Sequence, residues 1–91
     1  PTAFTATAES TEDGVALAWE AVEGASKYIV KAKAASEKTA TAIATVTGTE
    51  YVDAAASADE YTFYWVFPVY TNAAGKDVVG NASNYVFGMT K

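Results

Sequence analysis

One ten-residue stretch, from Tyr61 to Tyr70, constrains the fold of this chain more than any other segment. It reads YTFYWVFPVY. Side chains of a β-strand point alternately to its two faces, so the odd-numbered and even-numbered residues of the stretch lie on opposite faces. Both faces carry aromatic or branched apolar residues, which favours a central strand whose second face is at least partly covered. We expect the odd-numbered face, which begins with Tyr61 and Phe63, to line the core.

The same period of two recurs in the first third of the chain. It places Val15, Leu17 and Trp19 on one face of a strand, and Tyr28 and Val30 on one face of the next. Further short strands are expected at residues 2–8, 42–46, 50–52 and 85–89. Short strands separated by turn signals at this spacing indicate an all-β sandwich.

Residues 31–38, KAKAASEK, are good helix formers and offer a competing prediction of a helix. They lack large apolar residues at three- and four-residue spacing, so a helix here would have no face to bury. The pattern therefore favours the end of a strand followed by an exposed hairpin turn around Ser36 and Glu37.

Length and composition indicate one domain over residues 1–91 and exclude several classes of function. The chain has neither cysteine nor histidine, so the usual ligands of zinc and haem are missing. Six lysines against eleven carboxylates give a net charge of −5, which is unsuited to nucleic acid. No apolar run approaches the roughly 20 residues that span a bilayer, and no signal peptide is recognisable. We expect no cofactor and no membrane insertion.

The carboxylates fall into three groups, at residues 9–13, 20–23 and 53–60. None of these groups has the spacing of a calcium-binding loop, so we interpret them as solvated loops and predict no metal site. A pair of carboxylates for glycoside hydrolysis must be held across a cleft, and a small sandwich seldom has one. The sequence therefore predicts that the chain is not an enzyme.

A series of motifs, in order along the chain, resembles fibronectin type III domains of the bacterial type. Residues 17–30 form the run L-x-W-x-x-V-x-G-A-x-x-Y-x-V, and residues 46–53 read VTGTEYVD. Residues 61–63, YTF, are followed by GKDV at 75–78 and by SN at 83–84. The resemblance covers nearly the whole chain.

The resemblance implies an immunoglobulin-like Greek-key sandwich of seven antiparallel strands, with strands A, B and E facing C′, C, F and G. It implies a core built on six residues: Leu17, Trp19, Tyr28, Val30, Tyr61 and Phe63. In the family a tyrosine of strand F bonds back to upstream backbone at the tyrosine corner. Tyr61 is the expected corner residue, with Phe63 as the alternative. Ala55 stands where the family usually has leucine, and Trp65 or Phe67 is expected to fill that space.

The family resemblance also implies a function. The expectation is a non-catalytic spacer module, cut from a larger secreted or cell-surface bacterial protein such as a carbohydrate-active enzyme or an adhesin. Its partners would be neighbouring domains of the same polypeptide, and the chain itself would be a monomer. An engineered binding scaffold is a further hypothesis, because the family is used in that way.

A competing hypothesis is a module that binds a protein or a polysaccharide. The exposed face of strand F and the loop after it would carry the contact, because loops on a rigid scaffold often carry function. The candidate binding residues are Tyr64, Tyr70, Asn72, Lys76 and Asp77.

Overall fold

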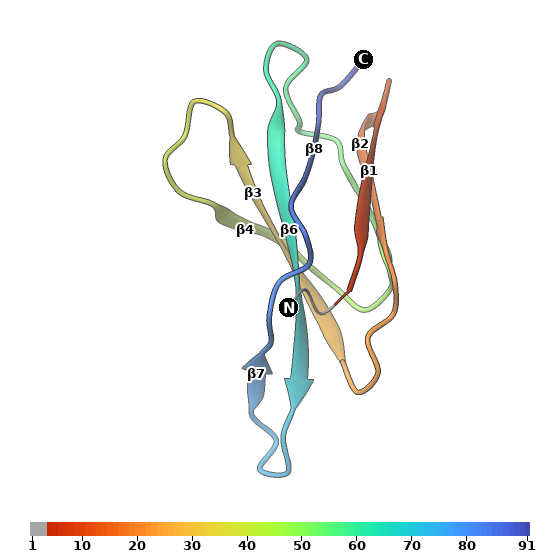
Figure 1. Cartoon of the computed structure of the whole chain (residues 1–91), viewed down its shortest axis with the longest axis vertical. Coiled ribbons are helices and arrows are strands. Elements are labelled where there is room, and N and C mark those ends of the chain that lie inside the picture. The colour runs from red at the N-terminus through yellow and green to blue at the C-terminus, as the bar shows by residue number, and fades with distance from the viewer. Residues whose placement is uncertain (1–3) are drawn as a thin grey trace.

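Eight β-strands make up the regular secondary structure of residues 4–91, the part of the chain that the computed structural model describes. The strands are β1 (Ala6–Thr11), β2 (Gly14–Trp19), β3 (Lys27–Ala34), β4 (Thr41–Val46), β5 (Glu50–Asp53), β6 (Thr62–Thr71), β7 (Asp77–Val79) and β8 (Val86–Gly88). They form two antiparallel layers (Figure 1). One sheet has the order β1-β2-β5; the other has the order β4-β3-β6-β7, with β8 also paired to β6.

The last strand of the expected seven is divided in two. Both β7 and β8 pair with β6, at its two ends. Pro68 lies in the part of β6 between these two pairings, and it has no N–H to donate to a neighbouring strand. Ser83 fills part of the gap, because its backbone N–H donates to the Val66 carbonyl and its hydroxyl accepts from the Val66 N–H. The fold class is confirmed, with eight strands in place of seven.

The segment with helix-forming residues is a strand and a turn. β3 continues to Ala34, and the chain then turns, with the Glu37 N–H donating to the Ala34 carbonyl. The first strand begins at Ala6 and extends further than expected, to Thr11; residues 2 and 3 of the predicted strand lie outside the described residues.

The core lies between the two sheets and is built around an aromatic pair. The rings of Trp19 and Tyr28 pack edge to face with centroids 5.6 Å apart. The Tyr28 hydroxyl accepts a 2.7 Å hydrogen bond from the Val22 N–H, which fixes the loop between β2 and β3. Four of the six residues expected in the core are buried: Leu17, Trp19, Tyr28 and Val30.

The two remaining core predictions, Tyr61 and Phe63, are wrong. It is the even-numbered face of β6 that enters the core, where Tyr64 and Val66 are both 0% exposed, whereas Tyr61 is 47% exposed. The cause is the pairing with β3, which sets Val66 opposite Val30. Directly paired residues project to the same face of a sheet, so the buried face of β3 determines the buried face of β6.

In β6, the tyrosine whose hydroxyl is anchored by a buried hydrogen bond is Tyr64. Neither Tyr61 nor Phe63, the two residues expected at the tyrosine corner, makes this contact. The Tyr64 phenol donates a 2.7 Å hydrogen bond to Oδ2 of Asp53 at the end of β5. The other oxygen of the same carboxylate, Oδ1, accepts from the Ala55 N–H at 3.1 Å. A buried side chain thus ties β6 to the turn that follows β5.

The space beside Ala55 is not filled by Trp65 or Phe67, which lie on the opposite, outer face of β6. A hollow of about 380 Å³ remains between the ends of the two sheets. Small residues of β3 and of the turn after β5, Ala55 among them, form much of its lining.

Candidate interaction surface

Six aromatic side chains gather on the outer face of the five-stranded sheet. We call them the aromatic face: Tyr61, Phe63, Trp65, Phe67, Tyr85 and Phe87. Four come from β6 or the residue before it, and two come from β8 or the residue before it. Because the even-numbered residues of β6 are in the core, its odd-numbered aromatic residues must point outward. β8 pairs with β6 so that Phe87 lies opposite Phe63.

The rings at the upper end of this face pack against one another. Tyr61 meets Phe87 edge to face, with centroids 5.4 Å apart and planes at 85°. Phe63 lies between Phe87 and Tyr85, with centroid distances of 5.7 and 6.1 Å and interplanar angles of 33° and 34°. The rings therefore hold each other in place and form a preorganised surface.

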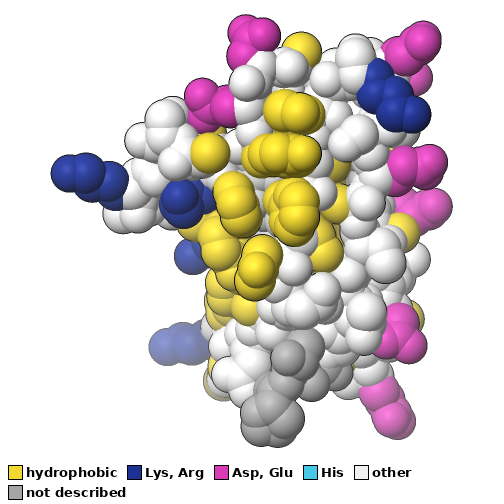
Figure 2. Space-filling model, turned by 45° about the horizontal axis from the view of Figure 1, so that its top comes forward, with side chains coloured by type: hydrophobic (Ala, Val, Ile, Leu, Met, Phe, Trp, Pro, Cys, Tyr) yellow, Lys and Arg dark blue, Asp and Glu magenta, His cyan; other side chains and the backbone are white. Residues whose placement is uncertain are grey.

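Much of the aromatic face is open to solvent. Tyr85 is 58% exposed, Phe87 50% and Tyr61 47%, while Phe63, Trp65 and Phe67 are partly buried. Figure 2 shows hydrophobic side chains gathered in one continuous area, with lysines beside it. Scattered apolar residues are normal on a protein surface, but a contiguous cluster of aromatic rings is typical of an interaction site.

Two lysines of β3 border the rings. The Lys31 ammonium lies 5.0 Å from the centroid of Phe67, and that of Lys33 lies 5.7 Å from the centroid of Phe63. A cation over the face of an aromatic ring is attracted by the ring quadrupole. These contacts place two positive charges at the margin of the aromatic face.

Two of the predicted binding residues, Tyr64 and Tyr70, belong to other parts of the structure. Tyr64 is buried, so it cannot contact a ligand at the surface. Tyr70 is half-buried, and its ring packs beside Gly24 and Gly80. A Cβ added at Gly24 would lie about 3.8 Å from this ring, and one added at Gly80 would lie closer. From the sequence, the exposed aromatic residues were assigned to the even-numbered face of β6, whereas they lie on its odd-numbered face.

The other three predicted binding residues lie in or beside the hairpin between β6 and β7. Asn72 shapes the loop, because its Oδ1 accepts from the N–H groups of Ala74 and Lys76. Asp77 is paired with Lys27 at 2.8 Å across the sheet. The hydrogen bond from Lys27 and its positive charge lower the pKa of Asp77. The Lys76 side chain is exposed. The structure does not bring these three residues together with the aromatic face.

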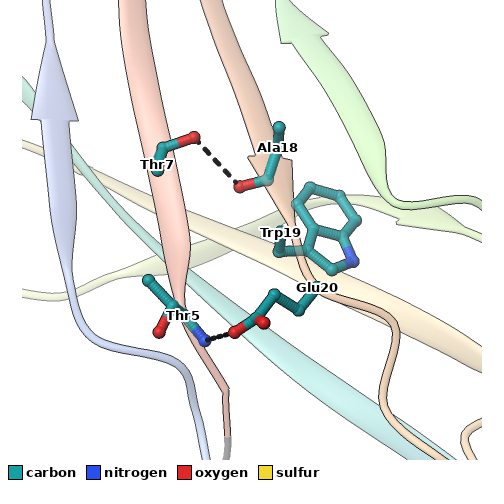
Figure 3. A pocket seen from close by; sticks show the side chains of 5 residues that line it. All are labelled: Thr5, Thr7, Ala18, Trp19 and Glu20. Atoms are coloured by element: carbon teal, nitrogen blue, oxygen red, sulfur yellow. Dashed lines mark hydrogen bonds between the residues drawn. The ribbon is translucent and has the colours of Figure 1, made fainter.

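A second hollow, of about 440 Å³, opens on the three-stranded sheet and is drawn in Figure 3. Its polar lining is largely engaged in holding β1 to β2. Glu20 Oε1 accepts from the Thr5 N–H at 3.3 Å, and the Thr7 hydroxyl donates to the Ala18 carbonyl at 3.4 Å. The hollow is open, and we find no arrangement there that resembles a catalytic site.

Within residues 4–91, no three acidic side chains converge as a metal site would require. The same residues contain no helix long and apolar enough to cross a membrane.

The sequence pattern did not place Tyr85, Phe87 or Lys33 at a binding surface. A signal for the correct face was present in β3, where Lys31 and Lys33 alternate with Val30 and Ala32. That alternation defines the solvent face of β3 without ambiguity, and a paired strand must share it. Once β3 and β6 are aligned, Phe63, Trp65 and Phe67 are assigned to the outer face of the sheet.

The comparisons with known proteins agree with this architecture. A solved structure described as an Fn3-like protein from Clostridium thermocellum superimposes with a TM-score of 0.72. The two chains are 28% identical, and the match covers 100% of this chain and 91% of the other. The chain has a fibronectin type III-like fold. No family model matches the sequence of this fibronectin type III-like domain, and no curated protein matches it either.

In the strand nomenclature of fibronectin type III domains, β1, β2 and β5 are strands A, B and E, and β3, β4 and β6 are C, C′ and F. β7 and β8 together take the place of strand G. The aromatic face of this fibronectin type III-like domain is thus the outer surface of its C, F and G strands.

Proposed function

We propose that this domain is a non-catalytic interaction module of a larger secreted or cell-surface bacterial protein, such as a carbohydrate-active enzyme or an adhesin. The aromatic face is the surface by which it holds a neighbouring domain or another molecule. One observation carries the proposal: six aromatic side chains lie on the outer face of one sheet, four of them pack ring against ring, and three are about half exposed.

Energetics support a contact at this surface. Burying apolar area contributes roughly 25 cal/mol per Å², so aromatic rings left in water are potential binding energy that the isolated domain does not use. Aromatic residues dominate the hot spots of protein interfaces. Because the rings already pack on one another, little side-chain entropy is lost when a partner covers them.

A non-catalytic role is supported by the two hollows. The hollow near Ala55 is lined by one buried carboxylate, that of Asp53. This carboxylate accepts hydrogen bonds from the Tyr64 phenol and from the Ala55 N–H. In the other hollow, the Glu20 carboxylate bonds to the Thr5 N–H. Such engaged groups serve the fold and leave little capacity for acid–base chemistry on a substrate.

A second candidate function is a polysaccharide platform. It is favoured by the tilt of only 33° and 34° between Phe63 and its neighbours Phe87 and Tyr85. Rings whose planes are tilted only moderately from one another can stack on successive sugar units.

The proposal is tested by oxidative footprinting. The purified chain and the same domain in intact culture of its source organism are labelled with hydroxyl radicals, and the modified side chains are quantified by mass spectrometry. We expect Tyr61, Tyr85 and Phe87 to be labelled strongly in the purified chain and several-fold less in the native setting, where a partner covers them.

Val52 is the matched control, because it is 49% exposed but lies on the other sheet, in β5. Its labelling is expected to be equal in the two settings. Equal labelling of Tyr85 and Phe87 in both settings would contradict the proposed interaction surface.

A further inference from the structure

We infer that the partner of the aromatic face is a protein surface with an apolar centre and carboxylates at its rim, opposite Lys31 and Lys33. The inference rests on the proposed function, because it assigns a chemistry to the partner of the same surface. The charges around the rings indicate this chemistry.

Among residues 4–91, the ammonium groups of Lys31 and Lys33 form no ion pair with a carboxylate. The single ion pair among the described residues joins Lys27 and Asp77. Lys33 Nζ donates to the backbone carbonyls of Ala34 and Glu37 at 3.4 and 2.8 Å, and Lys31 Nζ lies over a ring. Both charges thus border the apolar surface in an otherwise acidic chain, and both remain available to an external anion.

The two sheets differ in charge. The strands of the five-stranded sheet contain three lysines and one carboxylate, and those of the three-stranded sheet contain three carboxylates and no lysine. The aromatic face therefore has two lysines beside it, Lys31 and Lys33, in a domain whose net charge is −5. Charge complementarity of this kind selects partners and speeds their association.

A second copy of the chain does not fit this surface. Two aromatic faces packed together would bring the lysines of both copies toward one another, and like charges at an interface are unfavourable. The opposite sheet of another copy has the complementary charge, but its outward side chains on β1 and β2 are mainly threonine, alanine and glutamate. It therefore offers few apolar groups to cover the rings.

A neutral polysaccharide fits less well than a protein. Sugar hydroxyls need hydrogen-bond acceptors as well as donors beside the stacking rings. The phenols of Tyr61 and Tyr85 can donate and accept hydrogen bonds, whereas the ammonium groups of Lys31 and Lys33 only donate them. Carboxylates are the natural partners of these ammonium groups.

The experiment uses the isotopically labelled 91-residue chain and two synthetic probes. One is a ten-residue peptide of alternating Glu and Leu, and the other is the same peptide with Lys in place of Glu. Each is titrated while the amide NMR spectrum is recorded. We expect saturable shifts at Lys31, Lys33, Phe63 and Phe87 with the acidic peptide, and affinity about tenfold weaker or worse with the basic one. Salt is expected to weaken the acidic complex.

The variant Lys31→Glu with Lys33→Glu is expected to reverse the preference between the two peptides. Where that variant does not give a dispersed spectrum, Lys31→Gln with Lys33→Gln serves instead and is expected to abolish the preference. The matched control is Lys38→Glu with Lys76→Glu, two lysines outside the sheet, which leaves the preference unchanged.

Three results would overturn the inference. The first is binding of cellohexaose or chitohexaose at the aromatic face without binding of the acidic peptide, which would assign the surface to polysaccharide. The second is shifts at these residues that depend on protein concentration alone, which would indicate a second copy. The third is no saturable binding of either peptide. The footprinting experiment separates this result from failure of the proposed function. If the rings are labelled less in the native setting but neither peptide binds, the interaction surface stands and only the acidic partner is rejected.

Discussion

The phenol of Tyr64 donates a 2.7 Å hydrogen bond to the carboxylate of Asp53, across the interior of the sandwich. Tyr64 is fully buried, and Asp53 is only 8% exposed. A buried carboxylate is stable only when its oxygens have partners, and this one has Tyr64 on one oxygen and the Ala55 N–H on the other. The pair fixes β6 relative to β5 and determines which face of β6 is inside.

Tyr64→Phe is expected to lower the free energy of unfolding by about 1–3 kcal/mol, because it leaves a buried acceptor without its donor. Urea denaturation at pH 7 measures the loss. Tyr85→Phe, at a ring 58% exposed, is the control and should change stability by less than about 0.5 kcal/mol. In the double variant Tyr64→Phe/Asp53→Ala, the loss should be smaller than the sum of the two single losses. Additive losses would show that the pair is not coupled.

Alkaline pH should destabilise the fold through the same residue. Burial, the hydrogen bond to Asp53 and the negative charge of Asp53 raise the pKa of Tyr64 well above its ordinary 10. The unfolded chain therefore loses this proton first as pH rises, so the stabilisation is complete below about pH 10 and declines above it. Urea unfolding between pH 8 and 11.5 should show a steeper decline in the wild type than in Tyr64→Phe. Parallel curves would contradict this assignment.

Lys27→Met is expected to raise the pKa of Asp77 toward its ordinary 3.8. In the folded chain the hydrogen bond and charge of Lys27 hold that pKa lower. Any stabilisation from the pair is present above the ordinary pKa and is lost as pH falls, and it is small and sensitive to salt because both groups are exposed to solvent. Carboxyl ¹³C titration of Asp77 in both proteins checks the shift. An unchanged Asp77 titration in the variant would mean that Lys27 does not set it.

Gly14→Ala is expected to cost at least about 2 kcal/mol. Gly14 has φ +135°, and a Cβ there would collide with the Asp53 carbonyl oxygen of the neighbouring strand. Gly48→Ala is the matched control, since a Cβ at Gly48 meets nothing within 4 Å, and it should change stability by no more than about 0.5 kcal/mol. Thermal unfolding of the two variants checks the difference; similar melting temperatures would refute the steric explanation.

The candidate surface could be predicted only in part. Alternation within 61–70 led to the hypothesis of an aromatic binding surface on one face of this strand, and that function stays a prediction. The rings named for it, Tyr64 and Tyr70, were on the wrong face, and the contribution of Tyr85 and Phe87 was not foreseen. Their place beside Phe63 depends on the pairing of β6 with β8, two segments about 20 residues apart.

The sequence by itself determined the all-β fold, the positions of β2 and β3, and the burial of Trp19 and Tyr28. Large apolar residues alternate with small residues in β2 and with lysines in much of β3, and such a pattern allows a single orientation. β6 has two apolar faces, so its own sequence is compatible with either orientation. A shift of one residue exchanges every side chain between core and surface. Only the tertiary structure made that choice, through the pairing of β6 with β3 and the hydrogen bond from Tyr64 to Asp53, and in doing so it placed the aromatic face in solvent.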